Sequence, residues 1–199
     1  MESYKIKDLK LAVAIKNGAV GVLPTDTLYG IVGQAESKKA VEKIYNLKER
    51  NSQKPFIILI GAFLDLQKFE IRLDEKTKKF LDQIWPGKVS VILPCESKKF
   101  EYLHRGKKSL AFRLPAAKNL IKLLQKTGPL VAPSANPEGQ KPAETIKEVK
   151  KYFGEEVDFY VAGGRLKGVP STMVEIKKGK IDLIREGKLS KKLKRLIYN

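Results

Sequence analysis

The feature that most constrains this chain is a series of short apolar segments, separated by turns or by stretches with helical periodicity. Strands are expected at 19–24, 56–60, 89–93, 110–114, 130–132, 157–162, 172–176 and 181–185. Helices with one apolar face are expected at 6–16, 37–49, 74–84, 116–126 and 143–153, the second of them capped by Ser37. Strands interleaved with helices predict an α/β domain in which helices flank a mixed sheet.

Length and hydropathy indicate one domain and no membrane segment. The chain has 199 residues, 42% of them hydrophobic, so we expect a single domain over residues 1–199. The longest apolar run, 56–64, has nine residues, whereas a helix needs roughly 20 to cross a bilayer. The first residues mix charges and lack the apolar stretch of a secretory signal. We therefore expect a cytoplasmic protein without a membrane partner.

The chain is strongly basic, with 40 Lys and Arg against 22 Asp and Glu and a formal net charge of +18. Such a surplus favours polyanions, either a nucleotide or a nucleic acid. Lys-rich surfaces also occur in thermophilic proteins, so the charge alone leaves the partner open. The segment 188–199 is basic and amphipathic, and we expect it to pack one apolar stripe on the domain, with RNA contact as the alternative.

The chain has one Cys and one His, too few for a structural zinc site, which usually takes four such ligands. We expect Cys95 to be a small buried apolar residue and His104 to lie in a loop. The chain also lacks both standard phosphate-binding loops, Gly-x-x-x-x-Gly-Lys-Ser/Thr and Gly-x-Gly-x-x-Gly. A nucleotide would therefore be held by scattered cations and hydroxyl groups.

Polar groups gather in four places beside the predicted strands. The segment 25–30 offers hydroxyls, a carboxylate and a phenol after a strand, and the segment 48–55 carries three cations. Ser134 and Asn136 stand two positions apart in an extended segment, so their side chains point to one side. A capped turn, a solvated helix end and an Asx turn are the competing interpretations of these three segments.

The fourth place combines strand ends that carry Arg113, Ser171 and Arg185. An Arg within an apolar strand needs an anionic partner or a path to solvent. Arg113 is therefore either part of a binding site or part of a structural ion pair.

Taken in order, these segments resemble the YrdC/Sua5 family of threonylcarbamoyl-AMP synthases. The matching motifs are PTDTLYG (24–30), IYNLKER (44–50) with KPFIIL (54–59), AFRLP (111–115), APSANPEG (132–139), STMVEI (171–176) and LIREG (183–187). The resemblance implies a twisted open mixed sheet with a concave basic surface, in the short single-domain type of the family. It implies synthesis of threonylcarbamoyl-AMP from L-threonine, bicarbonate and ATP with Mg²⁺, for N6-threonylcarbamoyladenosine in tRNA. Double-stranded RNA and a downstream threonylcarbamoyl-transferase complex are the further partners it implies.

The resemblance also assigns roles to matching positions. It places the reaction centre at the Lys-x-Arg and Ser-x-Asn elements, which are Lys48, Arg50, Ser134 and Asn136. It places ATP beside Arg50, Lys54, Ser109, Ser134, Pro142 and Arg185, and threonine beside Thr27, Arg113, Ala132 and Ser171. It places no metal ligand on the protein.

Some positions depart from the family pattern. Leu59 stands where many relatives have His, Glu138 replaces a Ser, and Glu186 replaces a Pro. Two other functions stay open on the sequence. An RNA-binding module predicts salt-dependent RNA binding without a need for Thr27 or Asn136. Carbamoyl-adenylate chemistry, as in the related domain of hydrogenase-maturation proteins, predicts carbamoyl phosphate as the substrate.

Overall fold

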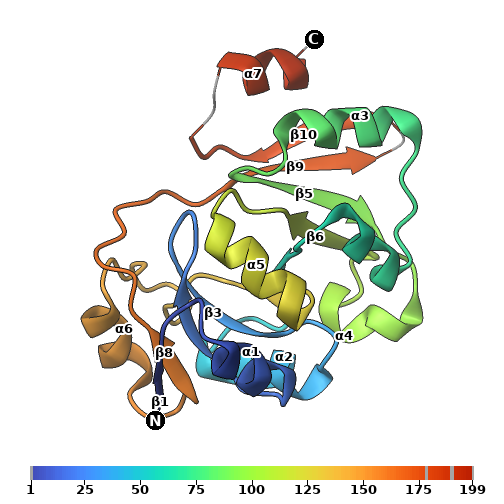
Figure 1. The fold of residues 1–199 in the computed structure, drawn as a ribbon. Helices are drawn as coiled ribbons and strands as arrows, with labels where there is room; N and C mark the ends of the chain where they lie inside the picture. Colours follow the sequence, from blue (N-terminus) through green and yellow to red (C-terminus); the bar gives the residue numbers. More distant parts are fainter. Residues whose placement is uncertain (1, 178, 189–190, 199) are drawn as a thin grey trace.

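A ten-stranded mixed sheet forms the centre of the molecule (Figure 1), a computed structural model that describes residues 2–177, 179–188 and 191–198. Its spatial order is β1-β8-β2-β3-β7-β4-β6-β5-β9-β10. The strands are β1 (Glu2–Tyr4), β2 (Gly21–Pro24), β3 (Tyr29–Gln34), β4 (Ile57–Leu59), β5 (Val89–Pro94), β6 (Ser109–Arg113), β7 (Leu130–Val131), β8 (Phe159–Val161), β9 (Thr172–Lys177) and β10 (Lys180–Arg185). The expected α/β architecture is therefore confirmed.

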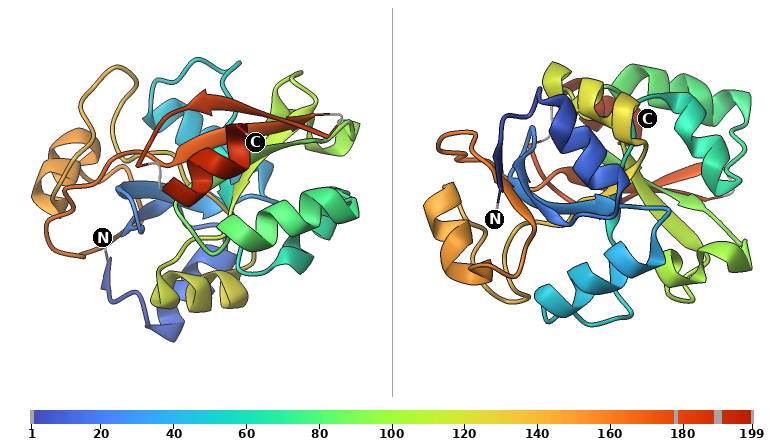
Figure 2. Two further views of the ribbon diagram at one scale, coloured as in Figure 1. Left: turned by 90° about the horizontal axis from the view of Figure 1, so that it is seen from above. Right: turned by 60° about the horizontal axis from the view of Figure 1, so that its bottom comes forward.

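Helices lie on both faces of this sheet (Figure 2). They are α1 (Leu9–Lys16), α2 (Lys38–Leu47), α3 (Glu75–Ile84), α4 (Glu101–His104), α5 (Lys118–Thr127), α6 (Ile146–Phe153) and α7 (Lys191–Tyr198), with 3-10 segments η1 (Phe63–Phe69) and η2 (Lys98–Phe100). The predicted cap of the second helix is confirmed, because the Ser37 side chain accepts a hydrogen bond from the Ala40 amide at 3.2 Å.

Two apolar cores form because neighbouring residues of a strand point to opposite faces. In β2, Val22 belongs to the larger core and Leu23 to the smaller one, and Tyr160 and Phe159 divide in the same way in β8. Helices α1 and α5 contribute to the smaller core, and α2, α3 and α6 to the larger one. Both faces of these strands are buried, which is why they read as continuous apolar runs.

Two strands were not expected. The chain begins with β1 rather than a helix, and this three-residue strand pairs in parallel with β8 from the distant end of the sequence. Strand β3 follows the polar segment directly and contains Gly30 and Gly33, which weaken a local strand signal. A Cβ on Gly33 would lie 3.1 Å from the Cβ of Ala40, so this glycine lets α2 pack closely on β3.

The structure confirms the buried position expected for Cys95 and the packing expected for the C-terminal segment, but His104 does not lie in the expected loop. Cys95 is buried and its thiol contacts the carbonyl of Phe69. His104 lies in α4 and is buried; its Nδ1 accepts a hydrogen bond from the Gly106 amide, which puts the proton of the neutral ring on Nε2. In α7, Leu193 packs on the larger core, while Leu189 of the predicted stripe lies outside the described residues. Within the described residues, no helix is long and apolar enough to span a membrane.

Candidate substrate-binding site

A cavity of about 160 Å³ opens where several strand ends and loops meet. Its walls come from the β2–β3 turn, the loop after α2, the end of β6, the loop after β7, the segment before β9 and the end of β10. The predicted site residues that line it are Thr27, Arg50, Arg113, Ala132, Ser134, Pro142, Ser171 and Arg185. The fold thus brings together groups from both ends of the sequence.

The segment 25–28 forms the turn of a β-hairpin, in which Pro24 of β2 pairs with Tyr29 of β3. The Thr25 hydroxyl donates a hydrogen bond to the Leu28 carbonyl at 2.6 Å and accepts bonds from the amides of Thr27 and Leu28. This local bonding is the capped turn that the residue types predict. These hydrogen bonds also hold the Thr27 hydroxyl beside Arg113. Three residues of the turn, Thr25, Thr27 and Leu28, line the cavity.

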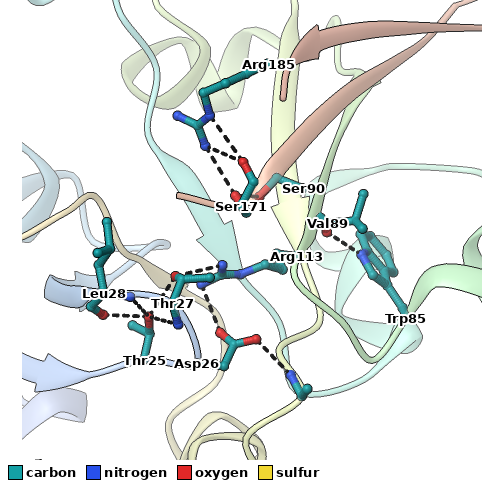
Figure 3. A network of polar contacts seen from close by, with 11 residues as sticks. Thr25, Asp26, Thr27, Leu28, Trp85, Val89, Ser90, Arg113, Ser171 and Arg185 are labelled. Atoms are coloured by element: carbon teal, nitrogen blue, oxygen red, sulfur yellow. Dashed lines mark hydrogen bonds and ion pairs between the residues drawn. The ribbon is translucent and has the colours of Figure 1, made fainter. Parts of the chain in front are cut away.

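Arg113 is the central cation of the cavity (Figure 3) and is only 4% exposed. Its Nη2 lies 3.2 Å from Asp26 Oδ1, and its Nη1 donates a hydrogen bond to the Thr27 hydroxyl at 3.1 Å. Burial lowers the pKa of Arg113 and Asp26 opposes this, but a guanidinium keeps its charge in proteins. Arg113 Nε and Asp26 Oδ1 form no hydrogen bond among the described residues, so the site retains unused polar groups.

A second cation approaches from β10. Arg185 donates hydrogen bonds to the Ser171 carbonyl from Nε and Nη2, and to the Ser171 hydroxyl from Nη2 (Figure 3). The Ser171 hydroxyl is 2.9 Å from that of Ser90 in the neighbouring strand β5. An irregularity in the β9–β10 pairing lies between Leu183 and Arg185 and changes the direction of the Arg185 side chain.

The cavity is electropositive. Burial and then Arg50 lower the pKa of Arg185, and Arg185 in turn helps to lower the pKa of Arg113. None of the described residues that line the cavity is acidic, and Asp26, directly beneath it, already faces Arg113. Three guanidinium groups around one space favour a ligand with more than one negative group.

Lys48 is buried outside the cavity wall, with 1% of its surface exposed. Its Nζ donates hydrogen bonds to the main-chain carbonyls of Ser134 and Asn136. The backbone of Glu49 adopts φ 48° and turns the chain between Lys48 and Arg50, of which only Arg50 lines the cavity among the described residues. In this structure, Lys48 holds the Ser-x-Asn loop in place.

The Lys48 ammonium should make stability depend on pH. Burial, with a smaller effect of Arg50, lowers its pKa from 10.5 to about 7. Between these two pKa values the unfolded chain binds the Lys48 proton and the folded chain does not, so the free energy of unfolding rises with pH. Below about pH 7 Lys48 is protonated in both states, and its contribution no longer depends on pH. We expect this free energy to rise from pH 7 to pH 9 by on the order of 2 kcal/mol more than in Lys48→Met, measured by urea denaturation. An equal rise in the native chain and in Lys48→Met would contradict the lowered pKa of Lys48.

The loop after β7 runs antiparallel to the beginning of β3. The Ile31 amide donates to the Pro133 carbonyl at 3.0 Å, and the Ala135 amide donates to the Tyr29 carbonyl at 2.8 Å. Asn136 is buried outside the cavity wall, and its Nδ2 donates to the carbonyls of Pro137 and Gln140. Asn136 therefore shapes the loop that presents Ser134.

Lys54 and Ser109 also lie outside the cavity wall. Lys54 forms an ion pair with Glu138, which also accepts a hydrogen bond from the Asn51 amide at 2.7 Å. These two donors hold the pKa of Glu138 below its usual range. Ser109 begins the strand that Arg113 ends, which separates them by about 13 Å. Leu59 is fully buried in the smaller core.

The sequence singled out the segment that holds Asp26 and Tyr29 but assigned neither residue a role in the site. The Tyr29 hydroxyl accepts a hydrogen bond from the Gly163 amide at 2.9 Å and donates one to the Gly164 carbonyl at 2.7 Å. A Cβ on Gly168 would lie 1.8 Å from the Thr27 carbonyl oxygen, so this glycine allows the segment 162–171 to cross the turn. The role of Asp26 depends on its contact with Arg113, and that of Tyr29 on its contacts with Gly163 and Gly164, all distant in the sequence.

Removal of the Tyr29 hydroxyl should loosen segment 162–171. Tyr29→Phe leaves the Gly163 amide without its acceptor, so we expect a loss of about 1–3 kcal/mol in the free energy of unfolding. Trypsin should also cleave faster at the exposed Arg165 and Lys167. Tyr160→Phe, which removes one hydroxyl bond to Gly154, is the control and should leave that cleavage unchanged. Unaltered cleavage in Tyr29→Phe would refute the role of the hydroxyl.

Comparison with known proteins connects this site to a family. Residues 13–187 match the Sua5/YciO/YrdC family model, which carries the description telomere recombination. The threonylcarbamoyl-AMP synthase of Marinobacter nauticus is 33% identical over 180 residues, with 86% of this chain and 93% of that protein covered. The threonylcarbamoyl-AMP synthase of Pyrococcus abyssi is 28% identical over 190 residues, or 93% of this chain. The chain spans 56% of the length of that second relative.

Solved structures agree with this relationship. P. abyssi Sua5 complexed with L-threonine has a TM-score of 0.87 and 28% identity, covering 97% of this chain and 57% of that chain. Escherichia coli YciO has a TM-score of 0.80 at 23% identity, covering 91% and 89%, and shows the fold alone.

The fold and the cavity define an α/β domain with an arginine-lined cavity between strand ends of a mixed sheet. The chain belongs to the Sua5/YciO/YrdC family, because the family model matches most of its length. The resemblance found in the sequence is thereby confirmed.

Proposed function

We propose that this chain is an L-threonylcarbamoyladenylate synthase, which converts L-threonine, bicarbonate and ATP into threonylcarbamoyl-AMP and pyrophosphate. The observation that carries the proposal is the convergence of Arg50, Arg113 and Arg185 with hydroxyl groups in one cavity. Family membership and the names of the relatives support the same activity.

Threonine would occupy the end of the cavity at Arg113. The guanidinium can bind a carboxylate while the Thr27 hydroxyl, the Ser171 hydroxyl and the main chain of Ala132 surround the remaining polar groups. A volume of about 160 Å³ is small beside the roughly 300–1,000 Å³ of sites for drug-sized ligands. The cavity therefore suits an amino acid, and ATP would extend outward from it past Arg50 and Arg185.

ATP would place its phosphates beside Arg50 and Arg185, with Ser134 and Pro142 along the nucleotide. Lys54 lies beside Arg50, which donates a hydrogen bond to its carbonyl, and its ammonium would reach the phosphates after release from the ion pair with Glu138. Among the described residues, no group of three or more His, Cys, Asp or Glu could hold a metal ion. Mg²⁺ would accordingly be held by the ATP phosphates and supply charge neutralisation there.

The reaction must bring two anions together. The neutral amine of threonine forms a bond to the carbon of bicarbonate, and the amine proton leaves with the hydroxide as water. An oxygen of the resulting N-carboxylate then attacks the α-phosphorus of ATP. The new oxygen–phosphorus bond forms as the bond to the bridging β-phosphate oxygen breaks and pyrophosphate leaves. Arg50 and Arg185 would stabilise the negative charge that gathers in this transition state.

Mass spectrometry tests the proposal directly. The full chain is incubated with ATP, Mg²⁺, bicarbonate and L-threonine, and threonine or bicarbonate is omitted in controls. Threonylcarbamoyl-AMP and pyrophosphate should appear in the complete mixture alone. Folded, ATP-binding protein that yields no product would reject the proposal, and turnover with carbamoyl phosphate would move the chain to the related carbamoyl-adenylate chemistry.

The product would then serve tRNA modification. A threonylcarbamoyl-transferase complex would transfer the group to the adenosine next to the anticodon, and the net charge of +18 favours a direct contact with double-stranded RNA. Transfer requires tRNA and that complex, so modified adenosine should appear only when both are added to the synthase reaction.

A further inference from the structure

Four side chains form a continuous stack that ends at the cavity. The Cζ atom of Arg105 lies 4.1 Å from the centroid of the Tyr45 ring. The Tyr45 and Phe56 rings are stacked, with centroids 4.0 Å apart and planes inclined by 23°. The Cζ atom of Arg50 lies 5.3 Å from the centroid of Phe56. The stack therefore connects the cavity cation to a residue outside the cavity wall.

Hydrogen bonds fix the cavity end of this stack. The Lys54 carbonyl accepts one bond from the Tyr45 hydroxyl at 3.0 Å and another from Arg50 Nε at 3.1 Å. Burial raises the pKa of the Tyr45 hydroxyl, which stays a donor. The Nη atoms of Arg50 form no hydrogen bond with the described part of the chain. The Phe56 ring thus lies against the face of the Arg50 guanidinium, and the Lys54 carbonyl occupies its Nε edge. The two Nη groups remain available for a ligand.

The other end of the stack is also fixed. Arg105 donates a hydrogen bond from Nη2 to Glu42 at 2.9 Å, with 17% of its side chain exposed. Its backbone adopts φ 51°, a conformation that disfavours residues with a side chain. The bond to Glu42 and the partial burial hold the Arg105 side chain against the Tyr45 ring.

Arg50 needs such support because it lies close to another cation. Arg50 and Arg185 line the same cavity, and Arg50 lowers the pKa of Arg185, as expected for two like charges that lie near each other. Without an anion between them, an unsupported Arg50 would turn towards solvent. The face of Phe56 and the Lys54 carbonyl both attract the guanidinium and offset this repulsion.

We propose that Phe56, Tyr45 and Arg105 are positioning residues that hold Arg50 with its fork towards the phosphates of ATP. Binding then need not order a flexible side chain. This inference rests on the proposed function, which gives Arg50 its contact with ATP.

Steady-state kinetics of the full chain test the proposal with Tyr45→Leu, which breaks the stack, and Arg105→Met, which removes its outer cation. We expect both variants to raise KM for ATP by about 5- to 10-fold and to leave KM for threonine within about twofold. Tyr45→Phe keeps the ring and should change KM for ATP by less than about threefold. Tyr102→Leu, which alters a Tyr of the same core outside the stack, is the control and should leave KM for ATP unchanged.

A second readout does not depend on activity. The ring of Phe56 should displace the Arg50 Nε–H signal in a ¹⁵N-edited NMR spectrum, and this signal is assigned by its loss in Arg50→Lys. We expect Tyr45→Leu to move it towards the position of an exposed Arg. An unmoved signal and an unchanged KM for ATP in folded Tyr45→Leu and Arg105→Met would overturn the proposal, as would an equal effect of Tyr102→Leu. Failure of the native chain to form product would instead reject the proposed function. The NMR signal would still show whether Tyr45 and Phe56 hold the Arg50 guanidinium in place.

Discussion

Arg113→Lys is expected to weaken threonine binding by about 100-fold, or about 2.7 kcal/mol, while the protein stays folded. The guanidinium contacts Asp26 and Thr27 at the same time and still has donor capacity for a carboxylate. A lysine keeps the charge but concentrates it at one point, so it cannot serve all three partners. Calorimetric titration of the native chain and the variant with L-threonine measures the difference.

A control for this experiment must make the same Arg-to-Lys substitution at a position outside the cavity wall. Arg165→Lys alters an exposed ion pair with Glu144 on segment 162–171, and we expect threonine affinity within about twofold of the native value. Asp26→Asn should also weaken binding, since Arg113 would lose the charge that orients it. Native affinity in folded Arg113→Lys would remove Arg113 from the threonine site.

Arg50→Ala is expected to reduce formation of threonylcarbamoyl-AMP by at least about tenfold, with the fold intact. The variant removes a cation that lines the cavity and has no acidic partner among the described residues. Its loss should therefore act on the charged transition state more than on the stability of the domain. Product formation under saturating threonine, with the thermal unfolding temperature measured in parallel, checks both parts of the expectation.

Lys54→Ala provides the comparison for Arg50→Ala. Lys54 belongs to the same basic segment, but Glu138 already holds its ammonium in a pair that is half exposed to solvent. We expect a smaller decrease, of about threefold or less. A decrease equal to that of Arg50→Ala would show that Lys54 leaves Glu138 to bind ATP, and near-normal turnover in Arg50→Ala would take Arg50 out of the reaction centre.

Much of the fold could be predicted because both faces of the central strands are buried. The apolar runs at 89–93 and 110–114 each became a strand, with bounds shifted by a residue. The expected helix over 37–49 also includes Lys48, which the structure buries at the C-terminal cap of α2. Strand β1 could not be predicted, because its three residues depend on pairing with β8.

The sequence predicts which cations and hydroxyl groups belong to the candidate site. It does not predict which of these side chains contact one another. Asp26 reads as an ordinary turn residue until Arg113 is placed beside it. The same holds for Tyr29, whose two partners lie in segment 162–171. Motif resemblance assigned Lys48 to the reaction centre, whereas the structure shows it bonded to the Ser134 and Asn136 carbonyls. Such pairings depend on tertiary contacts that local patterns do not contain.

The cavity walls come from the β2–β3 hairpin and from the β9–β10 pair, which lie on opposite sides of the middle of the sheet. A ligand that contacts both would act as a non-covalent cross-link between the two halves. By linkage, it would stabilise the whole domain against unfolding rather than one loop. Amide hydrogen exchange should then slow in strands that contribute no residue to the cavity wall, such as β8.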